Sequence, residues 1–308
     1  MCIRGLINTY LVWGFYDAGK STYIKDCLKN DYFYKRGKTL LVLLEDGEEE
    51  FDDEFLQSRN TVSVIYPGQG SVKDFLLDRI DMHQPDRIYI ECNTMMEGLQ
   101  ESLPDCLKVV FSITIMDGST LGLYYRNMRQ LLVNMITASN QVIFNRCPKR
   151  EMLDPYANIF RVMNKQAVYL WEGPGGYHEK AFGVMVPYDR ESMQLDLKEE
   201  DFVPFYLDSL EKPEVYAGKE ICALFQMKDE NGERRAGRRV MTCCAADIQF
   251  LSFPCILPDD ESEDLDGWFL LYAKGLIVSD SYGRKRLQLQ VERMNPVNPP
   301  EHAVIGLS

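Results

Sequence analysis

The first half of the chain alternates apolar runs with segments of helical periodicity. Residues 39–44 (TLLVLL) form a continuous apolar run, which is typical of a strand buried on both faces. Residues 71–82 instead place their apolar side chains at helical spacing. The expected strands are 7–12, 39–44, 61–66, 87–90, 107–116, 141–144 and 167–170, and the expected helices are 21–30, 52–59, 71–82 and 121–139. This alternation predicts an α/β fold with a mostly parallel sheet.

The pattern changes after Trp171. A glycine-rich turn at 173–176 is followed by acidic residues up to Asp201, and then by a short helix expected at 205–210. Strands are expected at 220–227, 239–243, 268–277 and 287–293, with a hairpin turn at 229–232. About five antiparallel strands predict a small β-rich, OB-like barrel. We therefore expect one domain over 1–172, a linker over 173–200 and a second domain over 201–308.

Composition and charge limit the classes of binding partner that we expect. The 308 residues carry a net charge of −13, so we discount nucleic acid and anionic membranes as partners. No apolar run reaches the roughly 20 residues of a membrane span. Polar Asn8 and Thr9 interrupt the N-terminal apolar stretch, so no signal peptide is expected and the protein should be cytoplasmic. The nine cysteines are mostly scattered singly, which predicts buried thiols rather than a disulfide framework.

Residues 14–22 (GFYDAGKST) contain a complete G-x-x-x-x-G-K-[ST] phosphate loop between an expected strand and an expected helix. Glycines let such a loop curl its N–H groups toward phosphate oxygens, and the following helix N-terminus adds positive potential. Lys20 would reach the β- and γ-phosphates, and the Ser21 hydroxyl would bind Mg²⁺. The expected nucleotide-binding residues of the loop are Gly14, Asp17, Ala18, Gly19, Lys20, Ser21 and Thr22.

Acidic residues follow three of the expected strands. Asp46, with Glu45 beside it, Glu91 and Asp117 should all face the phosphate side of a parallel sheet. A nucleotide hydrolase needs such acids to hold Mg²⁺ or to position water, although strand-end acids also cap loops. We expect Lys20, Asp46 and Glu91 to be catalytic, with Ser21, Asp46 and Glu91 around Mg²⁺.

These motifs resemble the CobW-like metallochaperone GTPase family, which includes the urease- and hydrogenase-accessory GTPases. The loop 14–22 matches the family's G-F-L-G-A-G-K-T-T, and Glu45-Asp46-Gly47 falls where its Asn-Glu and Gly occur. Residues 91–94 (ECNT) match E-T-T-G, and Asp117 matches a strand-ending Asp. Residues 145–148 (NRCP) correspond to the guanine-reading N-K-x-D, which implies that Asn145 and Arg146 contact the base. The resemblance covers about 170 residues and implies a GTP- and Mg²⁺-dependent switch or chaperone in metal homeostasis, commonly dimeric.

The chain departs from this family at three positions. Pro148 replaces the Asp that reads guanine, which leaves GTP and ATP both open. Thr94 replaces the family's glycine. Residues 67–70 (PGQG) stand where the family carries its C-x-C-C metal motif, so the usual metal-transfer site is missing.

The second half resembles a soluble domain found on bacterial permease-associated membrane proteins. The matching stretches are 216–219 (YAGK), 237–247 (GRRVMTCCAAD) and 267–268 (GW). This resemblance implies a membrane permease or a metal-dependent client protein as partner. Cys243, Cys244 and Asp247 offer thiolate and carboxylate ligands for Zn²⁺, and Cys255 is a further candidate. The alternative is a strand-to-turn segment with buried thiols.

Three functions are consistent with this sequence. The leading hypothesis is nucleotide hydrolysis that drives a switch. The second is a binding module that holds nucleotide with little turnover and partners a permease. The third, a small-molecule phosphotransferase, ranks last because the arginine cluster at 234–239 lies outside the expected nucleotide domain.

Overall fold

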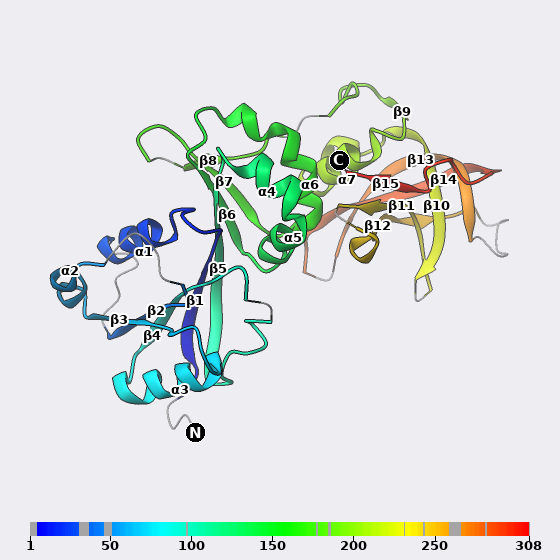
Figure 1. The fold of residues 1–308 in the computed structure, drawn as a ribbon. Helices are drawn as coiled ribbons and strands as arrows, with labels where there is room; N and C mark the ends of the chain where they lie inside the picture. The colour runs from blue at the N-terminus through cyan, green and yellow to red at the C-terminus, as the bar shows by residue number, and fades with distance from the viewer. Residues whose placement is uncertain are drawn as a thin grey trace. The chain divides into compact units, whose positions relative to one another are not determined.

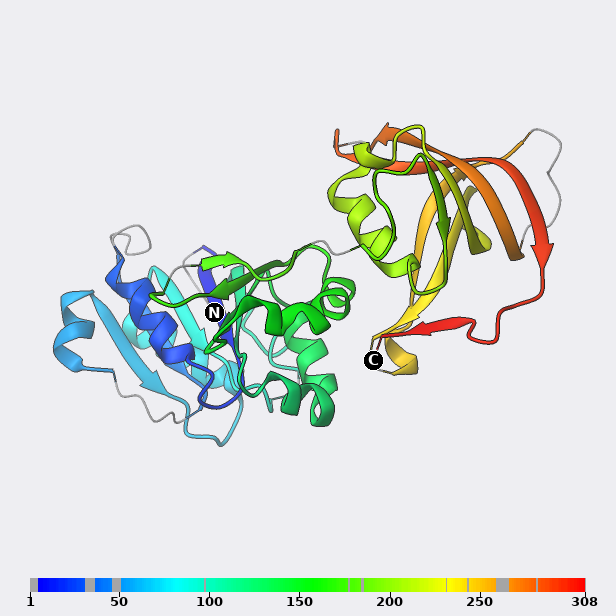
Figure 2. The same ribbon diagram turned by 90° about the horizontal axis from the view of Figure 1, so that it is seen from above.

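The computed structural model contains two compact units (Figures 1 and 2). The first comprises residues 1–155 and 163–182, and the second comprises 156–162 and 183–308. The structure describes residues 5–30, 37–45, 51–96, 98–176, 178–183, 186–230, 232–242, 244–258, 266–280 and 282–307. Within the described residues, no helix is both long and apolar enough to span a membrane.

The first unit is built on an eight-stranded sheet in the order β3-β2-β4-β1-β5-β6-β7-β8. Its strands pair in parallel, except that β8 runs antiparallel to β7. The strands are β1 (Ile7–Trp13), β2 (Thr39–Leu43), β3 (Thr61–Ile65), β4 (Arg87–Glu91), β5 (Leu107–Asp117), β6 (Gln141–Asn145), β7 (Val168–Glu172) and β8 (His178–Lys180). The predicted α/β class with a mostly parallel sheet is confirmed.

Helices cover both faces of this sheet (Figure 1). Helices α1 (Lys20–Lys29) and α2 (Asp53–Ser58) bury apolar side chains in one core cluster with strands β1, β2 and β4 to β6. Helices α4 (Leu121–Asn127) and α5 (Arg129–Thr137) follow β5, so a right-handed crossover to β6 places them on the opposite face. Helix α3 (Val72–His83) and the 3₁₀ helix η1 (Arg150–Tyr156) also fall in the first unit, whereas α6 (Ala157–Met163) falls almost entirely in the second.

The prediction of one long helix between β5 and β6 is wrong. The single helix expected over 121–139 is two helices, because the backbone of Met128 (φ −134°, ψ 38°) leaves the helical region between them. Apolar spacing continues across the break, so periodicity did not reveal it. The segment 173–200, expected to be a linker, contributes β8 to the first sheet and β9 (Gln194–Leu197) to the second. Strands of three and four residues are too short to show a period.

The second unit is β-rich, as predicted, and its strands close into a barrel. Pairing runs β10-β11-β12-β14-β13 and returns to β10, with β12 parallel to β14. The short strands β9 and β15 extend the sheet beside β10 and β11. The barrel strands are β10 (Glu220–Glu230), β11 (Glu233–Met241), β12 (Gln249–Ile256), β13 (Gly267–Ser279) and β14 (Lys285–Val297), and β15 is Val304–Gly306. A closed five-stranded barrel has no free edge among these strands, which removes the main aggregation hazard of a small sheet.

Two barrel features differ from the sequence prediction. The strand expected at 239–243 is the end of β11, which begins at Glu233, because arginines occupy positions where apolar residues would mark a strand. Strand β12 was not predicted. Between them, Ala245–Asp247 forms a 3₁₀ helix.

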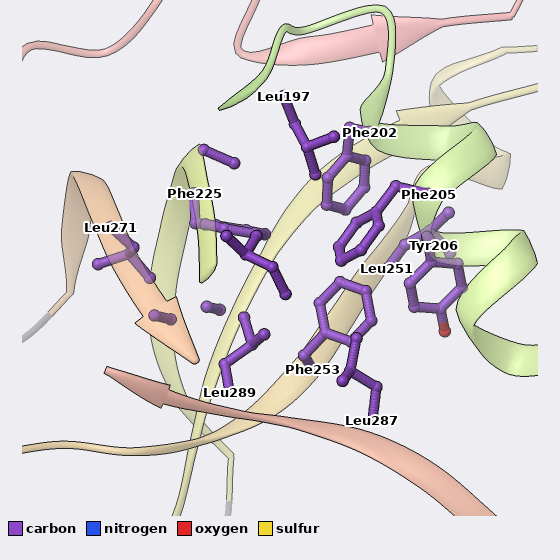
Figure 3. Packing of buried hydrophobic residues seen from close by; sticks show 14 of the residues in the cluster. Leu197, Phe202, Phe205, Tyr206, Phe225, Leu251, Phe253, Leu271, Leu287 and Leu289 are labelled. Atoms are coloured by element: carbon purple, nitrogen blue, oxygen red, sulfur yellow. The ribbon is translucent and has the colours of Figure 1, made fainter. Parts of the chain in front are cut away.

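Helix α7 (Phe202–Glu211) is almost entirely buried against the barrel. Figure 3 shows Phe202, Phe205 and Tyr206 of this helix pointing toward Phe225 and Phe253 of the barrel. The ring of Phe205 lies 5.2 Å from that of Phe253, and the ring of Phe202 lies 6.0 Å from that of Phe225, both centroid to centroid. Each aromatic pair of this kind stabilises by about 0.5–1.5 kcal/mol beyond the burial of its area. The helix therefore supplies much of the barrel's core.

A buried polar network joins α7 to the rest of the barrel unit. Asp208, fully buried, accepts hydrogen bonds from Arg190 at 2.9 Å and from the hydroxyl of Tyr216 at 2.6 Å. The hydroxyl of Tyr188 lies 2.6 Å from that of Tyr216. Because a buried carboxylate without partners is costly, these contacts determine how α7 is seated.

Replacing Tyr216 by Phe should lower the free energy of unfolding by about 1–2 kcal/mol. The ring still fills its site, but Asp208 and Tyr188 each lose a hydrogen-bond partner. Urea unfolding followed by fluorescence measures the change. Tyr282→Phe is the control, because Tyr282 is 83% exposed. An unfolding curve of Tyr216→Phe that overlays the wild type would contradict the role given to this network.

Among the described cysteines, six carry free thiols: Cys27, Cys92, Cys147, Cys222, Cys244 and Cys255. Cys106 is disulfide-bonded, so the expectation of unpaired thiols is wrong for that residue. Sequence spacing does not reveal which thiols the tertiary structure brings together.

Candidate functional site

The phosphate loop joins β1 to α1, as the motif requires. A Cβ atom at Gly14 would lie 2.6 Å from the carbonyl oxygen of Ile115 on the neighbouring strand β5, so only glycine allows this approach. Gly19 is left-handed (φ 96°) at the N-cap of α1. The first turn of α1 carries no acidic residue, so the positive potential at the helix N-terminus is not offset locally.

Lys20 folds back over the loop. Its amino group is buried and donates to the carbonyl oxygens of Gly14 at 3.0 Å and Phe15 at 2.9 Å. It also forms an ion pair with Glu45, which follows β2. The lysine is therefore held with its charge inside the loop, next to a carboxylate from another strand.

Ser21 and Glu91 meet at the start of α1. The Ser21 hydroxyl donates to the two carboxylate oxygens of Glu91, at 3.1 and 2.9 Å. Glu91 ends β4 and is 3% exposed. It is brought here by sheet register, because Val12, at the end of β1 just before the loop, pairs with Glu91. A hydroxyl and a carboxylate side by side form a set of hard oxygen ligands of the kind that Mg²⁺ prefers.

Residues at the end of β6 close the loop on its other side. The side-chain amide of Asn145 donates to the carbonyl oxygen of Ala18 at 2.8 Å. Arg146 donates to the carbonyl oxygen of Asp17 at 2.6 Å and to the carboxylate of Asp117 at 3.0 Å. Burial works to raise the pKa of Asp117, but hydrogen bonds from Ser119 and Arg146 outweigh it and hold that pKa below its usual value. Asp117 is thus an ionised partner that positions Arg146.

A cavity of about 280 Å³ lies over the loop. Its lining combines the loop with Glu45, Glu91 and Arg146. The structure therefore brings together Gly19, Lys20, Ser21, Thr22, Glu91 and Arg146 at one cavity, with Asp17 and Ala18 also on its wall. Asp46 lies outside the described residues. Glu45, its neighbour, is the acid that reaches Lys20, and the sequence analysis did not single it out because both residues follow the same strand.

The candidate zinc ligands lie in the second unit. Cys243 is outside the described residues, and within the described parts of the chain no group of three or more His, Cys, Asp or Glu residues could hold a metal ion. The Asp247 carboxylate caps the 3₁₀ helix, accepting from the backbone N–H groups of Thr242 at 3.3 Å and Cys244 at 3.2 Å and from the Thr242 hydroxyl. Zinc binding by Asp247 would disrupt this cap, and the zinc site stays a prediction.

Cys255 does not join Cys244. It lies near the far end of β12, about 20 Å along the strand from Gln249. Burial raises the pKa of the Cys255 thiol to about 12, as expected for a core side chain rather than a metal-binding thiolate. Cys255 is therefore not a further ligand beside Cys244 and Asp247.

A known protein family matches most of the second unit. The family model of the DUF1980 C-terminal domain matches residues 177–305, which is less than half of the chain. Several residues that carried the resemblance in this region serve the fold. Arg238 is buried, and its guanidinium carbon lies 4.9 Å from the ring centroid of Trp268. A Cβ atom at Gly237 would lie 2.1 Å from the carbonyl oxygen of Leu251, so this position requires glycine.

Two solved structures of HypB are similar to part of the chain. The hydrogenase maturation factor HypB from Archaeoglobus fulgidus is 12% identical, with a TM-score of 0.39, and the match covers 54% of this chain and 81% of that one. HypB from Helicobacter pylori in complex with nickel is 14% identical, with a TM-score of 0.32, over 55% of this chain and 79% of that one. This similarity is too low to transfer a site or a ligand. No curated protein matches the chain.

Proposed function

We propose that this protein binds a purine nucleoside triphosphate with Mg²⁺ at the phosphate loop and hydrolyses it as a molecular switch. The observation that carries the proposal is the contact between the Ser21 hydroxyl and the Glu91 carboxylate, in the same cavity as the buried Lys20. A phosphate-binding loop needs a cation, a hydroxyl and an acid at this point. Lys20 and Ser21 at the start of α1 supply the first two, and Glu91 at the end of β4 supplies the third.

The residues present fit Mg²⁺. Ser21 and Glu91 would hold the ion, and phosphate oxygens and water would complete its six positions, since Mg²⁺ usually takes only one or two protein carboxylates. The ion would neutralise charge that develops on the transferred phosphoryl group. Lys20 would bind the β- and γ-phosphates, and Asp46 remains a proposed partner for the attacking water. Glu45 would have to release Lys20 when the phosphates enter.

The biological setting is inferred from sequence resemblance. The CobW-like motifs support a switch or chaperone in metal homeostasis, with GTP or ATP as the nucleotide. The second half supports a membrane permease or a metal-dependent client as partner, and a homodimer in the cytoplasm is the proposed state. Nucleotide hydrolysis would then alter contacts between the first unit and that partner.

A nucleotide titration tests the proposal. We expect GTP or ATP with Mg²⁺ to raise the melting temperature of the full chain, by mass action on the folded state. Calorimetry with each nucleotide, alongside measured phosphate release, then separates binding from turnover. The absence of any stabilisation by either triphosphate at millimolar concentration would contradict the proposal.

The second candidate is a nucleotide-binding regulatory module with little turnover. Pro148 in place of the base-reading Asp, and Thr94 in place of the family's glycine, favour it. Tight binding of a triphosphate without phosphate release over hours would select this function, and release at a rate above the uncatalysed one would select hydrolysis.

A further inference from the structure

A second cavity continues from the phosphate site. It measures about 520 Å³ and shares Gly19, Thr22 and Arg146 with the cavity over the loop. From there it extends along α1 and over β5 and β6 to the β7–β8 hairpin. Its size lies in the range of small-molecule sites. A molecule that places its phosphates on the loop would therefore meet this groove with its other end.

The groove has both apolar and polar walls. Its floor includes Ile115 and Ile143, which belong to the core on the α1 side of the sheet. Tyr23 of α1 forms part of one wall. The crossover that follows β5, with α4 and α5, passes on the opposite face of the sheet. A flat, partly apolar ring fits between such a floor and wall.

Among the hydrogen-bond acceptors that line the groove, two lie at the ends of the neighbouring strands β6 and β7. The Asn145 amide donates to Ala18, while its carbonyl oxygen Oδ1 is buried and has no hydrogen-bond partner among the described residues. Glu172 ends β7, two residues beyond Leu170, which packs on the α1-side core, so both side chains lie on that face. A carboxylate only accepts hydrogen bonds when ionised. The groove therefore favours a ligand that donates a hydrogen bond to Asn145 or Glu172.

We propose that Glu172 selects the base of the bound nucleotide by accepting a hydrogen bond from an exocyclic amino group of a purine. This inference rests on the proposed function and adds a specificity residue to it. Adenine carries such a group at position 6 and guanine at position 2, whereas hypoxanthine carries neither. Glu172 thereby supplies, from the next strand, a base-reading carboxylate that Pro148 cannot provide.

Calorimetric titration of the full chain with Mg²⁺ and ATP, GTP or ITP tests this role. We expect ATP or GTP to bind at least about tenfold more tightly than ITP, which lacks the amino group. In Glu172→Ala, the affinity for the preferred nucleotide should fall to within threefold of that for ITP. Inorganic tripolyphosphate should bind both proteins equally, since it contacts only the loop. Preference for ATP assigns the 6-amino group, and preference for GTP assigns the 2-amino group.

Glu179→Ala is the matched control. Glu179 lies on the same hairpin and pairs with Trp171, whose side chain points to the other face of the sheet from Glu172, so this variant should keep the wild-type ratio. The inference would be overturned if the wild type bound ATP, GTP and ITP with equal affinity, or if Glu172→Ala kept the wild-type ratio of affinity for the preferred nucleotide to affinity for ITP. Binding of tripolyphosphate in that case would still support the proposed function. If the wild type bound none of the triphosphates and no tripolyphosphate, both the inference and the proposed function would be overturned.

Discussion

Replacing Lys20 by Ala should raise the dissociation constant for the nucleoside triphosphate–Mg²⁺ complex by about 100-fold or more. That factor corresponds to about 2.7 kcal/mol, the size of a charge-assisted hydrogen bond or two. The amino group of Lys20 is held inside the loop by the carbonyl oxygens of Gly14 and Phe15. Because its charge is already in position, little ordering is needed before it meets a phosphate. Calorimetric titration with GTP and ATP measures the loss.

Folding of the Lys20 variant must be checked separately. Lys20→Met keeps most of the length of the side chain and removes the charged, hydrogen-bond-donating amino group, so both variants should lose binding alike. Lys29→Ala, on the same helix, is the control, because Lys29 is exposed and pairs only with nearby Asp26 at 3.0 Å among its described contacts. A folded Lys20→Met protein that binds within threefold of wild type would show that the loop does not bind triphosphate.

Replacing Glu91 by Gln should reduce phosphate release about 100-fold and remove most of the Mg²⁺ dependence of nucleotide affinity. The change is nearly isosteric, and the Gln oxygen can still accept the hydrogen bond from Ser21. It removes the buried negative charge that would hold the cation. Titrations at several Mg²⁺ concentrations measure the dependence even if turnover is slow. Affinity without Mg²⁺ should change little.

Three parallel variants assign the acid that holds the cation. Glu45→Gln removes the partner of Lys20, and Asp46→Asn removes the acid that the sequence alone favoured beside Glu91. Glu101→Gln, at an exposed position, is the control. Full Mg²⁺ dependence in Glu91→Gln, together with its loss in Asp46→Asn, would show that the two acids had been assigned in the wrong order.

The amino-acid sequence was sufficient to predict the elements whose signal is local. The phosphate loop is one contiguous motif. A strand buried on both faces, such as 39–43, is recognised by its unbroken apolar run. The rule that parallel strands end at one edge also predicted that Glu91, 70 residues from Ser21, would lie beside the loop. Asn145, which donates to Ala18, was expected there from the family resemblance. For Glu91, chain order and strand direction are sufficient.

Tertiary structure decided the contacts that depend on register and on neighbouring strands. Sheet pairing of Val12 with Glu91 places this acid against Ser21, while Glu45 reaches Lys20 instead. Met128 breaks an otherwise continuous apolar period, and Asp247 caps a 3₁₀ helix where the sequence suggested a metal ligand. Local patterns report which face a residue occupies, but they carry no information about the partner across that face. That partner is set only when distant strands pair and their side chains pack.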